Sequence, residues 1–143
     1  MDPRPTLDDM VRWFESLTRA STREVPRYYA DDAYFRDPFN EVRSAASIER
    51  IYAHMFDQVA NPRFRVTGRW PGDDGTMLTW DFMFEMRGTG RTETVQGATF
   101  LRFGMDGRIV HHRDYWDAAG ELYERIPVLG GLMRAVRRRL RTP

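Results

Sequence analysis

Apolar residues recur every three to four positions in three segments of the first 60 residues, and this spacing predicts three helices. The first helix covers residues 6–20 and begins at Thr6, whose hydroxyl can accept a hydrogen bond from a backbone N–H of the first turn. A short helix follows at 23–29 and a longer one at 45–59. The apolar face of this third helix consists of Ile48, Ile51, Tyr52, Met55, Phe56 and Val59.

The period of the pattern changes to two after residue 62, which predicts strands in the second half of the chain. Clusters of Gly, Pro and Asp separate these strands, and Asp106-Gly107 is a strong signal for a hairpin. Helices followed by an antiparallel meander are typical of an α+β fold. The predicted strands, including a short one before the third helix, are 33–36, 63–70, 76–87, 92–103 and 108–116.

The strand at 76–87 has two different faces. One face is apolar and carries Trp80, Phe82, Phe84 and Met86. The other face is mixed and carries Thr79, Asp81, Met83 and Glu85. If the helices cover the mixed face, that face forms a pocket wall. The apolar face is then left to a second copy of the chain, which predicts a homodimer through the sheet face. In the alternative arrangement the apolar face packs on the helices and the mixed face meets solvent. Periodicity alone does not choose between the two.

The last segment, 128–143, predicts a basic amphipathic helix beyond a domain at 1–127. Arginine near a helix C-terminus complements the helix dipole. Two interpretations stay open for this helix. It makes weak contact with an anionic membrane surface, or it docks on its own domain or on a dimer mate.

Composition narrows the classes of function. The 143 residues make one domain with a formal net charge of +1 and no cysteine, so nothing selects nucleic acid as a partner and thiol chemistry is excluded. No apolar run is long enough to cross a membrane, and the first residues lack the apolar centre of a signal peptide, so we expect a cytoplasmic protein. The three histidines lack the spacing of a zinc site, and we expect no metal and no other cofactor.

Asp37 is the first candidate for chemistry. It stands where a short strand stops at Pro38, because proline holds the preceding residue out of the helical region. Aromatic residues come before it, and a carboxylate beside an apolar wall is a stronger base than one in water. In the alternative interpretation, this Asp-Pro pair begins a turn and has no chemical role.

Two segments resemble known enzyme families. Residues 29–33, Tyr-Ala-Asp-Asp-Ala, followed by Asp37-Pro38, resemble the segment around the catalytic base of ketosteroid isomerase. Residues 112–117, His-Arg-Asp-Tyr-Trp-Asp, resemble a segment of limonene epoxide hydrolase. Both families belong to the nuclear transport factor 2-like superfamily, which also contains the SnoaL-like polyketide cyclases. The resemblance implies a cone-shaped fold over residues 1–127, with N-terminal helices packed on a curved antiparallel sheet that encloses a pocket.

The resemblance to the isomerase implies roles for three residues. Asp37 falls at the position of the general base. Trp13 and Thr99 stand where the isomerase has the donors of its oxyanion hole, so this hole is degraded or different.

The resemblance to the hydrolase is also partial. Asp114 falls on one carboxylate of an Asp-Arg-Asp triad, and the other two positions are Asp81 and Met83. Tyr34 matches a tyrosine that helps to hold the attacking water. The chain thus keeps one acid from each enzyme and completes neither site.

Under this fold, strand parity predicts that Asp81, Thr99, His112 and Asp114 share the pocket-facing side, with Asp37 at the rim. Carboxylates and a histidine crowded in one cavity supply an acid and a base. We therefore expect a cofactor-free isomerase or cyclase with Asp37 as base and with Asp114, His112 and Asp81 as acid or orienting groups. The expected ligand-binding residues are Trp13, Tyr34, Phe56, Met83, Thr99 and Trp116.

The expected substrate is a small apolar molecule, steroid-, polyketide- or lipid-like. Three alternatives remain open. They are water addition in the manner of an epoxide hydrolase, ligand binding without catalysis by a homodimer, and a buried polar network that sets strand register and does no chemistry.

Overall fold

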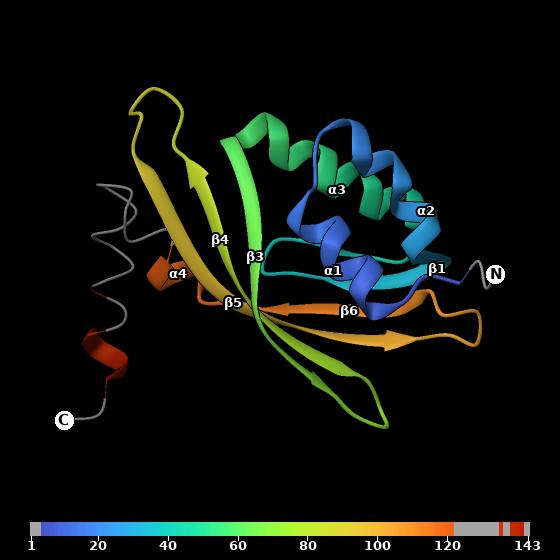
Figure 1. The fold of residues 1–143 in the computed structure, drawn as a ribbon. Coiled ribbons are helices and arrows are strands. Elements are labelled where there is room, and N and C mark those ends of the chain that lie inside the picture. The colour runs from blue at the N-terminus through green and yellow to red at the C-terminus, as the bar shows by residue number, and fades with distance from the viewer. Residues whose placement is uncertain (1–3, 122–134, 136–137, 142–143) are drawn as a thin grey trace.

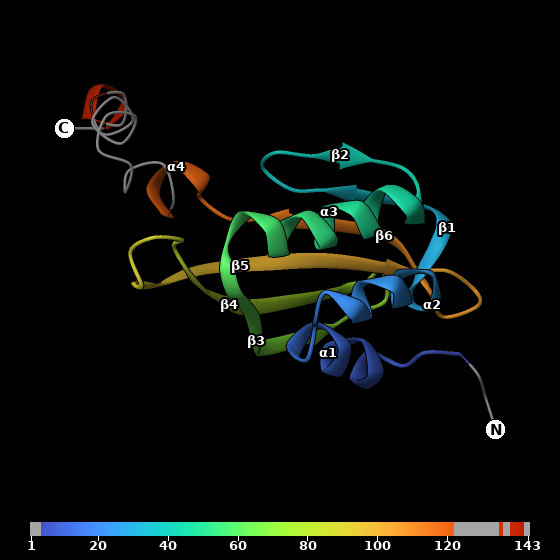
Figure 2. The ribbon, with the colours of Figure 1, turned by 90° about the horizontal axis from the view of Figure 1, so that it is seen from above.

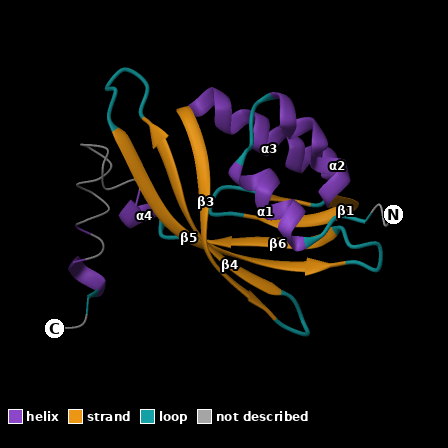
Figure 3. Cartoon of the chain, viewed as in Figure 1, coloured by secondary structure: helices purple, strands orange, loops and turns teal. Residues whose placement is uncertain are grey.

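The computed structural model describes residues 4–121, 135 and 138–141. Most of the predicted helix at 128–143 lies outside the described residues, and so does the end of the predicted domain at 1–127. The described strands form one strongly bent sheet, and helices α1, α2 and α3 lie together on its inner side (Figure 1, Figure 3). Seen from above, α1 lies beside β3 while α3 runs along the sheet (Figure 2).

The helices are α1 (Leu7–Glu15), α2 (Val25–Tyr28), α3 (Ala45–Gln58) and α4 (Ala118–Glu121), with a 3-10 turn, η1 (Ala20–Glu24), before α2. The strands are β1 (Tyr29–Arg36), β2 (Glu41–Val42), β3 (Ala60–Pro71), β4 (Thr76–Glu85), β5 (Thr92–Phe103) and β6 (Ile109–Tyr115). Their order in the sheet is β2-β1-β6-β5-β4-β3, and every pair is antiparallel except β1 and β6. This arrangement confirms the predicted α+β fold. Among the described helices, none combines the length and the apolar character needed to cross a bilayer.

Two helices begin at local capping signals. The Thr6 hydroxyl accepts the Asp9 backbone N–H at 3.1 Å, and the Asp9 carboxylate accepts the Thr6 N–H at 3.0 Å, which closes a capping box at the start of α1. The Ser44 hydroxyl accepts the Ser47 N–H at 3.1 Å and begins α3. These side chains satisfy N–H groups that the helices leave without an internal partner.

The first strand begins earlier than the sequence predicts. β1 starts at Tyr29 and not at residue 33, because Tyr29 pairs with Ile109 of the distant strand β6. The predicted helix at 23–29 is correspondingly reduced to η1 and the single turn of α2. Tyr29 thereby becomes a core residue without exposed surface.

Strand register decides which face of β4 the helices cover. Residues directly opposite in antiparallel strands share a face, and Leu78 lies opposite Thr99 while Trp80 lies opposite Gly97. Leu78 is buried in the main core with side chains of α1 and α3, and Trp80 belongs to a second buried cluster with Phe84. The apolar face is therefore the inner one, so the second of the two arrangements holds, in which the apolar face packs on the helices.

The outer face of the sheet carries a row of partly exposed rings. Tyr34 stacks on His111 with ring centroids 5.0 Å apart, and Phe100 meets the same imidazole edge-on at 6.0 Å. Arg43 and Arg102 lie over the Tyr34 and Phe100 rings. A homodimer through the sheet stays a prediction, although the apolar face of β4 for which it was made is the inner one.

The Trp80 indole occupies the space that a side chain at residue 97 would need. A Cβ on Gly97 would stand 2.4 Å from Trp80 Cη2 and 2.6 Å from Cζ2. With that space open, the indole packs against β5 and its N–H reaches the Thr99 hydroxyl at 2.8 Å. Gly97 is thus a packing requirement of the inner face.

Gly97→Ala is expected to lower the free energy of unfolding by about 1–3 kcal/mol, because the added methyl group displaces the Trp80 ring. The urea midpoint of unfolding measures this change. Gly72→Ala is the matched control, since a Cβ there meets only the Gly75 carbonyl oxygen at 3.4 Å. Equal midpoints for the two variants would contradict the packing role of Gly97.

Candidate functional site

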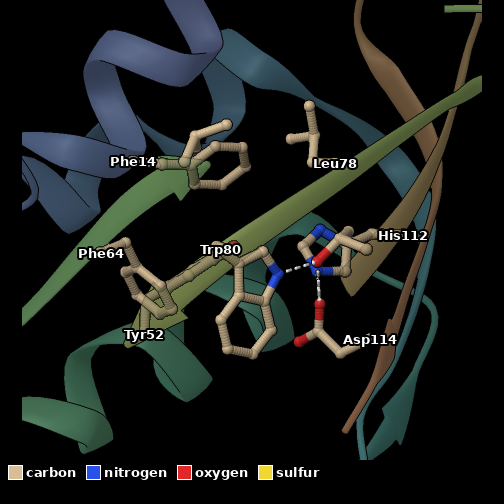
Figure 4. A pocket seen from close by; sticks show the side chains of 9 residues that line it. Phe14, Tyr52, Phe64, Leu78, Trp80, His112 and Asp114 are labelled. Carbon is tan, nitrogen blue, oxygen red and sulfur yellow. Dashed lines mark hydrogen bonds and ion pairs between the residues drawn. The ribbon is translucent and has the colours of Figure 1, made fainter. Parts of the chain in front are cut away.

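A small cavity lies between helices α1 and α3 and the inner face of the sheet. Its volume is about 40 Å³, room for a few water molecules. Six side chains give it apolar or aromatic walls: Phe14, Tyr52, Phe64, Val66, Leu78 and Trp80. Its polar lining comes from Thr99, His112 and Asp114 (Figure 4).

The three polar side chains are joined by hydrogen bonds inside the cavity. Trp80 Nε1–H donates to Thr99 Oγ1 at 2.8 Å, and the Thr99 hydroxyl donates to Asp114 Oδ1 at 2.6 Å. His112 Nε2 lies 2.7 Å from the same carboxylate oxygen. Figure 4 shows the indole nitrogen turned toward His112 and Asp114.

The same chain of hydrogen bonds continues into the core on the other side of His112. The Tyr29 hydroxyl lies 2.9 Å from His112 Nδ1 and 2.8 Å from the Tyr52 hydroxyl. Tyr29, Tyr52, Thr99 and His112 are all buried, and the Asp114 side chain is 17% exposed. A partly exposed carboxylate therefore stands in the middle of a polar chain whose other members are buried.

The sheet brings these groups together by pairing. Thr99 of β5 lies directly opposite Asp114 of β6, and Leu101 lies opposite His112, so both pairs share the inner face. His112 and Asp114 are two residues apart on one strand and point the same way. Tyr29 enters from β1 and Tyr52 from α3.

Burial raises the pKa of both buried tyrosines well above their usual value near 10. For Tyr29, the neighbouring Tyr52 and the charge of Asp114 add to this effect, and for Tyr52 the charge of Asp114 adds to it. Both phenols therefore stay protonated at neutral pH. Each supplies one O–H donor and one acceptor oxygen to the chain.

Asp37 lies outside the lining of the cavity and holds its own turn. Its Oδ1 accepts the backbone N–H groups of Phe39 at 2.8 Å and Asn40 at 2.7 Å. The Asn40 side-chain amide donates to both carboxylate oxygens at 3.2 Å. The role of Asp37 as a base stays a prediction, but its oxygens are already engaged.

Asp81 and Met83 lie on the outer face of β4. Asp81 is opposite Arg65 and Gln96, and Arg65 Nη2 donates to its carboxylate at 2.7 Å. The expectation that Asp81 shares the pocket side with Thr99 is wrong, because Thr99 pairs with Leu78 and so aligns with the other parity of β4. Met83 is two residues from Asp81, so it lies on the same outer face and away from the cavity.

Tyr34 and Trp13 also lie away from the cavity lining. Tyr34 is on the outer face, where its hydroxyl donates to Glu41 Oε2 at 2.9 Å. Trp13 is buried in the core, and its N–H donates to the Ser21 carbonyl at 3.0 Å, so it offers no donor to a ligand.

Phe56 and Trp116 lie at the margins of the two cores. Phe56 packs against the main core, with Arg19 over its ring at 6.0 Å. Trp116 packs against the Trp80 cluster and meets Phe39 edge-on at 5.7 Å. Of the expected ligand-binding residues, Thr99 is the one that lines the cavity.

Sequence reasoning missed most of the cavity walls. Phe14, Tyr52, Phe64, Leu78 and Trp80 belong to apolar stripes that indicate burial, and only the strand register assigns them to a cavity. Nothing in the sequence around Tyr29 indicated that its hydroxyl belongs to the chain of hydrogen bonds. Among the described residues, no three His, Asp or Glu side chains are arranged to hold a metal ion.

A bent six-stranded sheet with helices over its inner face and a cavity between them defines the nuclear transport factor 2-like class of fold. The chain belongs to the SnoaL-like domain family, whose sequence profile matches residues 10–112. The predicted resemblance is thereby confirmed at the level of the family. No curated protein matches the chain.

Solved structures share this fold at low sequence identity. An NTF2-like protein of unknown function from Exiguobacterium sp. 255-15 has a TM-score of 0.68 at 18% identity, covering 79% of this chain and 98% of that one. AclR, a putative hydroxylase from Streptomyces galilaeus, has a TM-score of 0.65 at 21% identity, covering 85% and 90%. An LEH-like epoxide hydrolase from M. tuberculosis has a TM-score of 0.64 at 16% identity, covering 88% and 93%.

The raised pKa values of Tyr29 and Tyr52 predict a loss of stability at alkaline pH. A group whose pKa is higher in the folded state contributes its full stabilisation below its unfolded pKa, near 10, and loses it as the pH rises further. Each tyrosine is expected to cost up to about 1.4 kcal/mol per pH unit above 10. Urea midpoints measured from pH 8.5 to 11 test this expectation.

The chain suits this measurement, because all 22 of its basic residues are arginine and it has no cysteine. Tyrosines are then the side chains that titrate in this range. Tyr52→Phe removes one of the two tyrosines whose pKa is raised most and should make the decline above pH 10 shallower than in the wild type. Parallel declines would contradict the assignment.

Proposed function

We propose that the protein is a cofactor-free enzyme that moves a proton on a compact apolar substrate, with Asp114 as the base. The supporting observation is that the two carboxylate oxygens of Asp114 differ in their hydrogen-bond partners. Oδ1 accepts the Thr99 hydroxyl and contacts His112 Nε2, whereas no described residue donates to Oδ2, although Asp114 lines the cavity. One oxygen thus fixes the side chain and the other is left for a substrate C–H.

The surroundings of Asp114 suit general base catalysis. A base must be held within hydrogen-bonding distance of the proton that it removes, and the two contacts on Oδ1 provide that positioning. A substrate that fills the space between the aromatic and aliphatic walls displaces water from Asp114, and fixed donors act more strongly where water is excluded. Isomerisation and cyclisation both begin with such a proton transfer.

The size of the cavity supports a compact substrate. About 40 Å³ is far less than the several hundred Å³ of a drug-sized ligand site. A steroid- or polyketide-sized molecule requires the rings of Phe14, Phe64 and Trp80 to move aside.

Water addition receives less support from the lining. A two-carboxylate mechanism needs a second acid or a bridging arginine near Asp114, and no other charged carboxylate or guanidinium lines the described cavity. Asp81 and its partner Arg65 lie on the opposite face of the sheet.

Deuterium exchange tests the proposed function without knowledge of the natural substrate. The protein is incubated in D₂O with compact cyclic ketones, such as cyclopentanone, 2-cyclohexenone and 2-tetralone, and exchange beside the carbonyl is followed by proton NMR. Asp114→Asn is expected to slow exchange by about 100-fold or more while ligand binding, measured by thermal shift, persists.

Asp37→Asn is the competing variant. Since the Asp37 oxygens already hold the turn at Asn40, we expect its exchange rate to stay within a few-fold of the wild type. A large loss in Asp37→Asn together with a normal rate in Asp114→Asn would assign the base to Asp37. Binding of ketones by the wild type without any exchange would indicate a non-catalytic binder.

A further inference from the structure

Tyr29 makes a hydrogen bond that the proposed proton transfer does not require. Its hydroxyl contacts His112 Nδ1 on one side and the Tyr52 hydroxyl on the other, at 2.9 and 2.8 Å. The three side chains come from β1, β6 and α3 and are buried. Within the described residues, every buried side-chain nitrogen and oxygen has a partner.

The direction of the hydrogen bonds follows from the Trp80 end of the chain. An indole N–H only donates, so Thr99 Oγ1 accepts it and gives its own proton to Asp114. An ionised carboxylate has no proton to give and only accepts, so the imidazole nitrogen that faces Asp114 Oδ1 is the donor. His112 Nε2–H therefore donates to Asp114.

His112 Nδ1 is then the atom whose proton depends on the charge of the ring. In the neutral ring Nδ1 accepts, so Tyr29 donates to it and accepts from Tyr52. In the charged ring Nδ1–H donates, so Tyr29 accepts from it and donates to Tyr52. A backbone carbonyl at this place could only accept, whereas a phenol hydroxyl serves both states.

We propose that Tyr29 is a positioning residue that lets His112 gain and lose a proton inside the core without losing a hydrogen bond. His112 is then a working acid–base group beside Asp114, and not a fixed structural link. A charged imidazole attracts the Asp114 carboxylate more strongly and makes it a weaker base, so exchange is expected to slow as His112 becomes charged. This last consequence rests on the proposed function, whereas the exchange of hydrogen bonds at Tyr29 does not.

The groups around His112 leave few other causes for a change in its charge. Among the described residues, the ionisable side chains in its hydrogen-bonded chain are Asp114 from β6, Tyr29 from β1 and Tyr52 from α3. Thr99, on β5, is not ionisable in this range. The Phe35 and Phe14 rings pack beside the imidazole with centroids 4.5 and 6.3 Å away, and the adjacent His111, on the outer face, interacts with it electrostatically.

Nitrogen-15 NMR of the His112 ring, assigned with His112→Asn, tests the proposal between pH 5.5 and 8.5. At pH 8.5 we expect a protonated Nε2 and an unprotonated Nδ1. As the pH falls, Nδ1 should gain a proton while the amide spectrum stays that of the folded protein. An Nδ1 that is protonated at pH 8.5, or one that stays unprotonated down to pH 5.5, overturns the proposal.

Tyr29→Phe is expected to move this transition to lower pH by about one unit, because a charged N–H without an acceptor costs more than a neutral nitrogen without a donor. Tyr28→Phe is the matched control. It removes the same hydroxyl one residue earlier, where the ring stacks on Trp13 at 5.0 Å and the hydroxyl bonds to no described residue. The transition in this control should equal that of the wild type.

A transition in Tyr29→Phe at the wild-type pH would contradict the positioning role. If Tyr29→Phe does not fold, Tyr52→Phe gives the second test, since it keeps Tyr29 and removes only its next partner. We expect a smaller shift in the same direction, and no shift counts against the proposal. Because these spectra need no substrate, a failure of the ketone exchange would remove the proposed function and leave the result for Tyr29 intact.

Discussion

The hydrogen bond between His112 Nε2 and Asp114 Oδ1 is the interaction on which the rest of the site depends. It places a carboxylate at the edge of an apolar core, where charge is costly unless donors surround it. The register of β5 and β6 provides Thr99 directly opposite Asp114, and β1 provides Tyr29 behind the imidazole. With Trp80 of β4, which donates to Thr99, four strands and α3 are thus joined by one chain of hydrogen bonds. A change of register at any of them would leave a buried group without a partner.

The walls of the cavity follow from how the bent sheet packs its rings. Trp80 has two roles: its ring forms part of the cavity wall, and its N–H donates to Thr99 at the start of the chain of hydrogen bonds. This is possible because Gly97 leaves the surface of β5 open under the indole. Aromatic side chains pack with their large faces and still keep a polar group, which explains how the cavity combines apolar walls with hydrogen-bonding side chains.

The sequence predicted the features that depend on neighbours in the chain. The cap at Thr6, the apolar stripe of α3 and the long strands are local, and the family resemblance supplied the fold. Thr99, His112 and Asp114 were placed correctly on the inner face. Asp81 was not, because the face of β4 depends on its register with β5, and a shift of one residue exchanges the faces. Tyr29 could not be predicted, since its partner lies 83 residues away on a strand that pairs in parallel.

That separation has a consequence for how the protein is made. During synthesis β1 leaves the ribosome long before β6. Tyr29 therefore cannot bond to the His112 imidazole until most of the domain has been synthesised. Contacts between distant parts of a chain form slowly, because a long loop must close before they contribute. A nascent chain that stops short of β6 therefore contains the residues of α1 to α3 and of β1 to β5, yet it has neither the Asp114 carboxylate nor the closed core.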